Sequence, residues 1–174
     1  MPDETMAAVN LRPAIEADRE AMRTLVDEDL AGTPYGEVLS FFLGLMEGSH
    51  TESRAVVAEH RGEFVGYALF GEVAGAVGTG RIHFIGTTTR AALDTWGVEL
   101  CEAAVDEMVA RGDRLIIAEL PDEPVLAGKH ALLSRCGFEV VARVRDYYRD
   151  GVDLVLLQRR FASPDQADQE GQTP

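Results

Sequence analysis

Glu119, His83 and Tyr148 are the side chains whose type and position in the sequence could support proton transfer. Glu119 follows Leu115 to Ala118, a continuous apolar run that is typical of a strand buried on both faces. The carboxyl end of such a parallel strand opens onto the ligand crevice of an α/β sheet. A partly desolvated carboxylate there could act as a general base, and the alternative is an ordinary exposed residue at a strand end.

His83 lies in the apolar segment from Arg81 to Thr88, between Ile82 and Phe84. In a regular strand it faces away from both neighbours. It could be a general base there, or an ordinary hydrogen-bonded core histidine. Tyr148 lies in a turn between two late strands, where it could supply an acid, line a pocket, or simply pack at a rim.

The charge balance limits the partners of the chain. Thirty acidic residues outnumber sixteen basic ones, for a formal net charge of −14 in 174 residues. Such a surface repels nucleic acid and anionic membranes, so neither is expected as a partner. A local basic pocket can still hold an anionic cofactor. Lys129 is the only lysine, and this acidic, arginine-for-lysine composition is typical either of a halophile or of a genome with strong base bias.

The sequence contains no sign of a disulfide framework, a metal site or a membrane segment. Cys101 and Cys136, the two cysteines, lie in apolar periodic segments and are expected as small core residues. No Cys/His spacing indicates metal ligands. No apolar stretch is long enough to span a bilayer, and no basic-then-apolar signal segment opens the chain, so a cytoplasmic location is expected.

Periodicity and turn residues predict an α/β domain of the order β-α-α-β-β-β-α-β-α-β-β. The β-α-β crossover in its middle places two strands in parallel. We therefore expect one mixed sheet of about seven strands with helices on both faces, over residues 9–161. Residues 1–8 are expected to be flexible and residues 162–174 to form a disordered tail. The predicted elements are strands at Val9 to Ala14, Arg54 to His60, Glu63 to Val73, Arg81 to Thr88, Arg114 to Glu119, Phe138 to Val144 and Val152 to Gln158, and helices at Ile15 to Leu30, Thr33 to Gly48, Asp94 to Ala110 and Val125 to Arg135.

Three short motifs lie in order along these elements. They are AEHRGEFVGYA from Ala58 to Ala68, GVELCEAA from Gly97 to Ala104, and RCGFE from Arg135 to Glu139. Their order and spacing resemble the GNAT superfamily of N-acetyltransferases, whose hairpin, central helix and late turn have similar patterns. The resemblance covers roughly Val9 to Phe161 and implies the GNAT fold.

The resemblance implies acetyl-CoA as the cofactor. Backbone groups of the fourth strand, at Ile85 and Thr87, would pair with its pantetheine arm. Its pyrophosphate would lie at the start of the following helix, because successive N–H groups at a helix N-terminus bind anions. The residues that match this part are Thr95, Trp96, Gly97 and Val98. Trp96 could instead be packing.

The residues Lys129 and His130 open the segment that would face the coenzyme. Either side chain could contact a phosphate. The alternative interpretation of both is a solvated surface residue.

Two parts of the GNAT pattern are degenerate here. The pyrophosphate pattern Q/R-x-x-G-x-G/A corresponds to Ala92 to Gly97, where Gly97 alone is kept. Asp94 is either the N-cap of the helix or a like charge close to the phosphates. Leu133 stands where many members have a tyrosine that protonates the leaving thiolate, so an acid must come from elsewhere.

The resemblance implies direct acyl transfer from acetyl-CoA to a small amine in a ternary complex. The amine would be deprotonated by Glu119 or through water, and Tyr148 could supply the acid. The acidic surface favours a cationic, polyamine-like acceptor. The alternative is a catalytically degenerate GNAT-fold protein that binds a small ligand or a partner. A homodimer through a sheet edge is a further expectation from the resemblance.

Overall fold

The computed structural model describes residues 8–30, 33, 35–36, 39 and 53–162. Almost all of both terminal segments lies outside these residues, as does the predicted helix from Thr33 to Gly48, except Thr33, Tyr35, Gly36 and Leu39. The described strands and helices follow one another in the predicted order. They are β1 (Asn10–Pro13), α1 (Arg19–Asp29), β2 (Ser53–His60), β3 (Glu63–Glu72), β4 (Thr79–Thr87), α3 (Arg90–Ala110), β5 (Leu115–Pro121), α4 (Ala127–Arg135), β6 (Glu139–Arg149) and β7 (Val152–Arg160), with 3-10 turns at Glu16–Asp18 and Pro124–Leu126.

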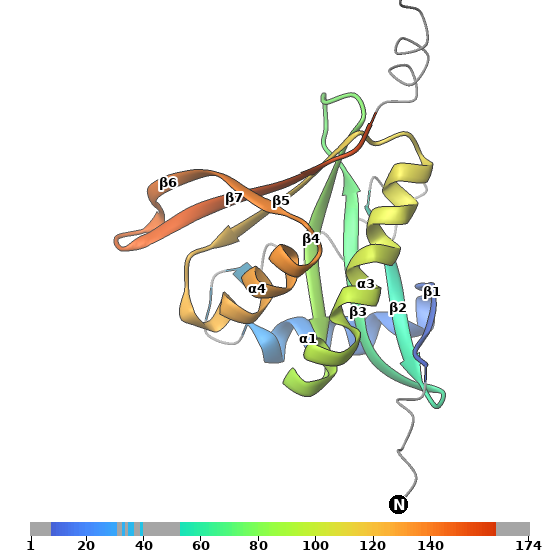
Figure 1. Ribbon diagram of the computed structural model, residues 1–174. Coiled ribbons are helices and arrows are strands. Elements are labelled where there is room, and N and C mark those ends of the chain that lie inside the picture. Colours follow the sequence, from blue (N-terminus) through green and yellow to red (C-terminus); the bar gives the residue numbers. More distant parts are fainter. Residues whose placement is uncertain (1–7, 31–32, 34, 37–38, 40–52, 163–174) are drawn as a thin grey trace, which may run out of the picture.

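The strands form one seven-stranded mixed sheet of order β1-β2-β3-β4-β5-β7-β6, which confirms the predicted fold class (Figure 1). Among the described strands, β4 and β5 are the only parallel neighbours, and the crossover between them carries α3. The β6–β7 hairpin extends away from the body of the domain. None of the helices in the described ranges is long and apolar enough to cross a membrane.

The central strands of the sheet are covered on both faces by two separate groups of apolar side chains. On one face α3 and α4 pack through residues such as Leu100, Met108 and Leu132. On the other face α1 packs through Met22 and Val26. This two-sided cover explains the nearly continuous apolar runs of the central strands, because both faces of these strands are largely shielded from water.

Gly66 shows how closely β3 and β4 approach each other near the end of the pair. A Cβ atom at Gly66 would lie 2.5 Å from the carbonyl oxygen of Gly86 and 2.7 Å from the side chain of Thr87. Any side chain would therefore have to push the two strands apart. This close approach explains why the AEHRGEFVGYA motif has a glycine at position 66.

Helix α3 begins at Arg90, four residues before the predicted Asp94. Thr89 is the N-cap, with extended backbone (φ −142°, ψ 156°), and its side-chain oxygen accepts from the Ala92 amide at 3.0 Å. The prediction that Asp94 is the N-cap is therefore wrong, and the segment Ala92 to Gly97 is helical rather than a loop. The physical reason is a strong cap followed by good helix formers, with no glycine before Gly97.

Candidate active site

The strands β4 and β5 separate halfway along their length. Within the described residues they pair only from Thr79–Ile82 to Leu115–Ala118, although β4 continues to Thr87 and β5 to Pro121. Beyond this point β5 pairs only with β7 among the described strands. The backbone groups on the β5 side of the last part of β4 are thereby left for other partners.

A β-bulge on β4 lies at the start of this separation. Phe70 of β3 pairs with Ile82, and Leu69 pairs with Phe84, so His83 has no opposite residue. Ile82 and Phe84 consequently pack on opposite faces of the sheet. The prediction that His83 faces away from both neighbours is therefore wrong, since it assumed a regular strand. Bulges bend a strand and re-aim its side chains, which accounts for the divergence of β4 from β5.

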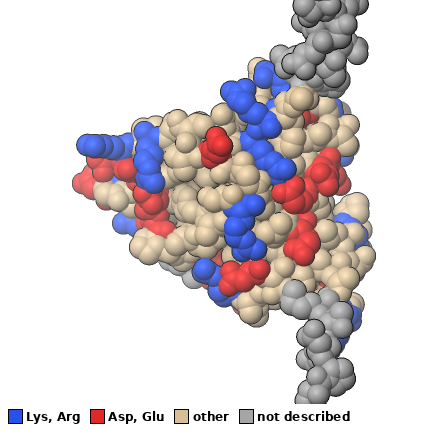
Figure 2. Space-filling view, viewed as in Figure 1, with Lys and Arg blue, Asp and Glu red and all other residues tan. Residues whose placement is uncertain are grey.

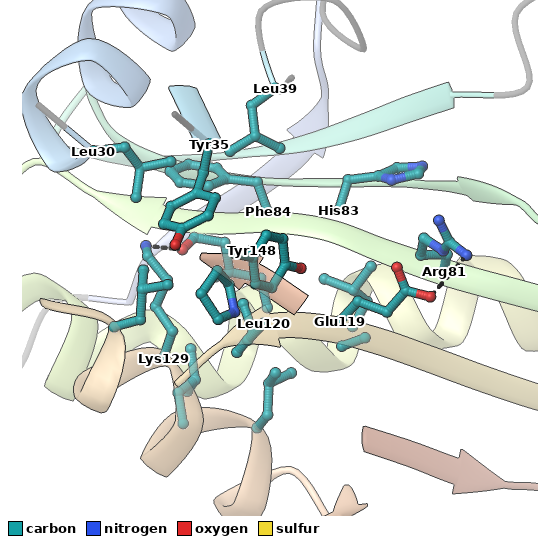
Figure 3. Close-up of a pocket in the computed structure, with 17 residues that line it drawn as sticks. Leu30, Tyr35, Leu39, Arg81, His83, Phe84, Glu119, Leu120, Lys129 and Tyr148 are labelled. Carbon is teal, nitrogen blue, oxygen red and sulfur yellow. Dashed lines mark hydrogen bonds and ion pairs between the residues drawn. The ribbon is translucent and has the colours of Figure 1, made fainter. Parts of the chain in front are cut away.

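A cavity of about 240 Å³ occupies the gap between the two strands. Its walls come from the separated parts of β4 and β5, from α4, from the end of α1 and from β6 (Figure 3). Lys129 lies at one end of the cavity, and Glu119 with Arg81 at the other. Most of the lining is apolar or aromatic: Leu30, Tyr35, Leu39, Ile82, Phe84, Ile85, Ala118, Leu120, Pro121, Leu126, Leu132, Leu133 and Tyr148.

Glu119 lies in the β5 segment beyond Ala118 and lines the cavity, where the sequence predicted a general base. Its Oε1 accepts from the Arg81 guanidinium at 3.2 Å, and about a third of its side chain is exposed (34%). Arg81 stabilises the carboxylate charge next to apolar walls. Its position at the cavity wall allows the carboxylate to meet an ammonium group that enters the cavity.

His83 and Tyr148 line the same cavity as Glu119. Burial, reinforced by the charge of Arg81, lowers the pKa of His83 to about 4, so its imidazole is neutral and weakly basic at neutral pH. Burial, followed by the nearby charge of Glu119, raises the pKa of Tyr148 to about 12. Its phenol therefore keeps its proton and can donate a hydrogen bond.

Lys129 is buried, with 8% of its surface exposed, so the solvated-surface interpretation of this residue is wrong. Its Nζ donates to the Ile85 carbonyl oxygen at 2.5 Å, pairs with Asp29 Oδ2 at 2.5 Å, and lies 4.3 Å from the centre of the Phe84 ring. Burial lowers the pKa of Lys129, and the nearby Asp29 opposes this effect. Sequence reasoning missed the role of Asp29, although a single lysine in an otherwise arginine-only chain was the available signal.

The predicted cofactor residues lie in two places. Ile85 and Thr87 lie in the part of β4 beyond the bulge, and Ile85 lines the cavity. Thr95, Trp96, Gly97 and Val98 lie within α3, and none of the four is among the residues that line the cavity.

Trp96 and His130 both have partners within the protein. The Trp96 ring lies against His60 of β2, with ring centres 4.8 Å apart. The Nε2 atom of His130 is 3.0 Å from the Pro121 carbonyl oxygen. Neither observation requires a ligand.

The first turn of α3 is the place where a diphosphate would have to fit. The amides of Arg90 and Ala91 have no partner within the helix itself, whereas the Ala92 amide bonds to Thr89. Arg90 is exposed and lies 3.6 Å from Asp94. The turn therefore offers two amides and one guanidinium to an anion.

Arginines also gather beside this turn. Figure 2 shows a band of basic side chains running down the face on which α3 and α4 lie, with acidic groups to its sides. Arg90 of α3 packs against Gly128 of α4. Arg135 of α4 donates to the Asp94 carbonyl, and Arg159 of β7 pairs with Glu102 of α3. A local basic surface thus exists on a strongly acidic chain, and it fits an anionic ligand.

No family model matches the sequence, and no curated protein is significantly similar to it. Solved structures are similar. A Desulfovibrio desulfuricans protein assigned to the GNAT family of acetyltransferases superposes with a TM-score of 0.78 at 25% identity, over 89% of this chain and 100% of that one. A ribosomal-protein-alanine N-acetyltransferase from Brucella melitensis gives 0.70 at 21% identity, over 87% and 99%.

A Salmonella typhimurium protein assigned as an acetyltransferase, solved with its cofactor acetyl-CoA, also gives a TM-score of 0.70, at 20% identity over 91% of this chain and 98% of that one. These structures share the mixed sheet, and the sequence carries the three motifs in the order that the fold requires. On this evidence the chain is a member of the GNAT superfamily.

Proposed function

We propose that the protein is an acetyl-CoA-dependent N-acyltransferase that acts on a small amine by direct transfer in a ternary complex. The observation that carries the proposal is the cavity between β4 and β5, which brings Glu119 next to the part of β4 that has left its neighbour. Structural relatives described as acetyltransferases, one of them solved with acetyl-CoA, support it.

Acetyl-CoA would supply an acyl group activated as a thioester. Backbone groups on the β5 side of β4, beyond Ile82, would bind the arm, and an amide of the same strand would polarise the carbonyl that is attacked. The basic surface formed by Arg90, Arg135 and Arg159 would bind the phosphate groups of acetyl-CoA.

Glu119 would take the proton from the acceptor ammonium and leave a neutral amine as the nucleophile. Tyr148 would donate to the departing sulfur, because its raised pKa of about 12 keeps the phenol protonated. Leu133 also lines the cavity, but its side chain has no ionisable group and cannot act as an acid. His83, with a pKa of about 4, is uncharged at neutral pH and does not attract the acceptor ammonium as the Glu119 carboxylate does.

The second candidate is a GNAT-fold module that binds a ligand without catalysis. One observation favours it: Lys129 already occupies the Ile85 carbonyl, a group that the coenzyme arm would use. The helical start of α3, where the GNAT pattern has a glycine-rich loop, favours it too. In this case acetyl-CoA would bind weakly or not at all.

Titration calorimetry with acetyl-CoA at low and at high salt separates the two candidates. Binding in the micromolar range is expected for the acyltransferase, and no binding at millimolar acetyl-CoA would contradict it. Glu119→Gln should lower turnover at least tenfold and leave acetyl-CoA affinity unchanged, since a lost general base typically costs about 10²–10⁴-fold. Glu139→Gln, at an exposed position on β6, is the matched control. Unchanged turnover in Glu119→Gln would remove this residue from the mechanism.

A further inference from the structure

The hydroxyl group of Tyr35 is a polar group without a partner at the wall of the cavity. Tyr35 lines the cavity and is 9% exposed. Its hydroxyl oxygen is fully buried and has no hydrogen-bond partner within the described part of the chain. A buried polar group without a partner costs about 1–3 kcal/mol, so such a group at the wall of a cavity indicates a ligand that would satisfy it.

The Lys129 ammonium supplies a second donor at the same end. In Figure 3 the Tyr35 ring points toward the end of the Lys129 side chain, and both residues line the cavity. An ammonium group has three N–H donors. The Ile85 carbonyl and Asp29 account for two of them, and the third remains for a ligand.

We propose that Tyr35 and Lys129 form a subsite that binds a neutral carbonyl oxygen of a ligand. The phenol O–H and the third ammonium N–H both donate, so the group between them must accept. The oxygen is neutral because Asp29, 2.5 Å from Nζ, already compensates the positive charge. A carboxylate would place a second negative charge beside Asp29 in a largely apolar cavity, where like charges interact unfavourably.

The other residues that line the cavity indicate the chemistry of the rest of this ligand. Leu30, Leu39 and Leu126 line the cavity and form one apolar cluster with Tyr35, and the Phe84 ring lies next to the ammonium. At the opposite end, Glu119 offers a carboxylate. The complementary acceptor is an amine with an apolar body and an amide carbonyl, which replaces the polyamine-like acceptor expected from net charge. This assignment of an acceptor rests on the proposed function. The pantetheine arm also carries amide carbonyls, so the coenzyme is the second source of the same chemistry.

Calorimetry with three matched amines tests the subsite without requiring turnover. Phenylalaninamide has the neutral carbonyl, phenylalanine a carboxylate, and 2-phenylethylamine neither. The wild-type protein should bind the amide about 5–10-fold more tightly than 2-phenylethylamine, the effect of one good hydrogen bond. Tyr35→Phe removes a single oxygen atom and one of the two donors, so it should lower this preference severalfold while leaving 2-phenylethylamine binding unchanged. Tyr147→Phe, 58% exposed on β6, is the control and should keep the preference.

A parallel titration with acetyl-CoA identifies the source of the carbonyl. If Tyr35→Phe weakens acetyl-CoA and leaves the amine preference intact, the subsite holds the coenzyme arm and the proposal stands with that ligand. If Tyr35→Phe changes neither ligand, or if phenylalanine binds as tightly as its amide, the proposal is overturned. A Tyr35-dependent amide affinity without any acetyl transfer would support the subsite and refute the acyltransferase, so the two failures are distinguishable.

Discussion

Asp29 and Lys129 form an ion pair whose two halves should contribute very unequally to stability. Lys129 is 8% exposed, and the Asp29 side chain is 34% exposed. Removing one member of a buried pair costs about 3–5 kcal/mol, because the other charge is left without compensation. About a third of the Asp29 side chain is exposed, although its Oδ2 atom is buried, so we expect a smaller cost than this range, about 2–3 kcal/mol, for Asp29→Asn. In a chain of this size that corresponds to a fall of about 5–10 °C in melting temperature.

Lys129→Met should cost much less than Asp29→Asn. Methionine keeps the unbranched stem over Phe84 and removes the buried charge, while Asp29 remains partly solvated. The Ile85 carbonyl loses one hydrogen bond, which is worth about 1 kcal/mol, but the cost of burying an ammonium disappears. The net change is about 0–1 kcal/mol. The double variant should resemble Lys129→Met alone, which gives a coupling of about 2 kcal/mol between the two positions.

Urea unfolding of the wild type, the two single variants and the double variant, all at one salt concentration, measures these differences in the free energy of unfolding. Asp27→Asn, exposed on the same helix, is the control and should change the free energy of unfolding by less than about 0.5 kcal/mol. An Asp29→Asn cost no greater than that of the control would refute the reasoning. A larger loss in Lys129→Met than in Asp29→Asn would refute it equally, since the ammonium would then be a net source of stability.

Three other predictions concern the strands, the N-terminal segment and the pH profile. Gly66→Ala should lower the free energy of unfolding by about 3 kcal/mol, measured with denaturant, because its Cβ meets strand backbone at 2.5 Å. Asp18→Asn should cost about 1–3 kcal/mol at pH 7. Its hydrogen bond from Arg12 lowers the pKa of the carboxyl group, so this stability is present above about pH 4 and is lost in the wild type as pH falls through the lower folded pKa, a loss that the variant should not show. Tyr148, with a pKa of about 12, and His83, at about 4, should give no limb in a turnover profile between about pH 5 and pH 9, and a tyrosine-dependent limb in that range would contradict the placement of Tyr148.

The order of the elements was predictable because local patterns determine it. The run from Leu115 to Ala118 indicated a strand covered on both faces. The structure places this strand between β4 and β7, with Ile116 and Ala118 buried and Leu115 and Ile117 half-buried. Arg61 and Gly62 indicated a two-residue hairpin, and both have positive φ (55° and 83°) as such turns require. Glu119 was placed at a cavity by the same logic, since the ends of parallel strands meet at one edge of a sheet.

The residues that shape the cavity could not be predicted because their positions depend on pairing between distant segments. Nothing in the segment from Arg81 to Thr88 marks His83 as the bulged residue, which is defined only by its register against Leu69 and Phe70. Lys129 appeared as a surface residue beside His130, because its partners Asp29 and Ile85 are far away in the sequence. Tyr35 carried no motif at all.

The start of α3 links these observations to the coenzyme question. The GNAT pattern aligned on Gly97 predicts that the helix starts near Asp94, after a loop. In the structure Thr89 caps the helix, which therefore begins at Arg90. An anion at this end meets two amides and the Arg90 side chain instead of a longer series of glycine amides. Its affinity would then depend mainly on the exposed arginines, whose attraction is screened within about 10 Å at 0.1 M salt. A steep loss of acetyl-CoA affinity with salt should therefore accompany this helical start, whereas salt-independent affinity would mean that the anion binds elsewhere.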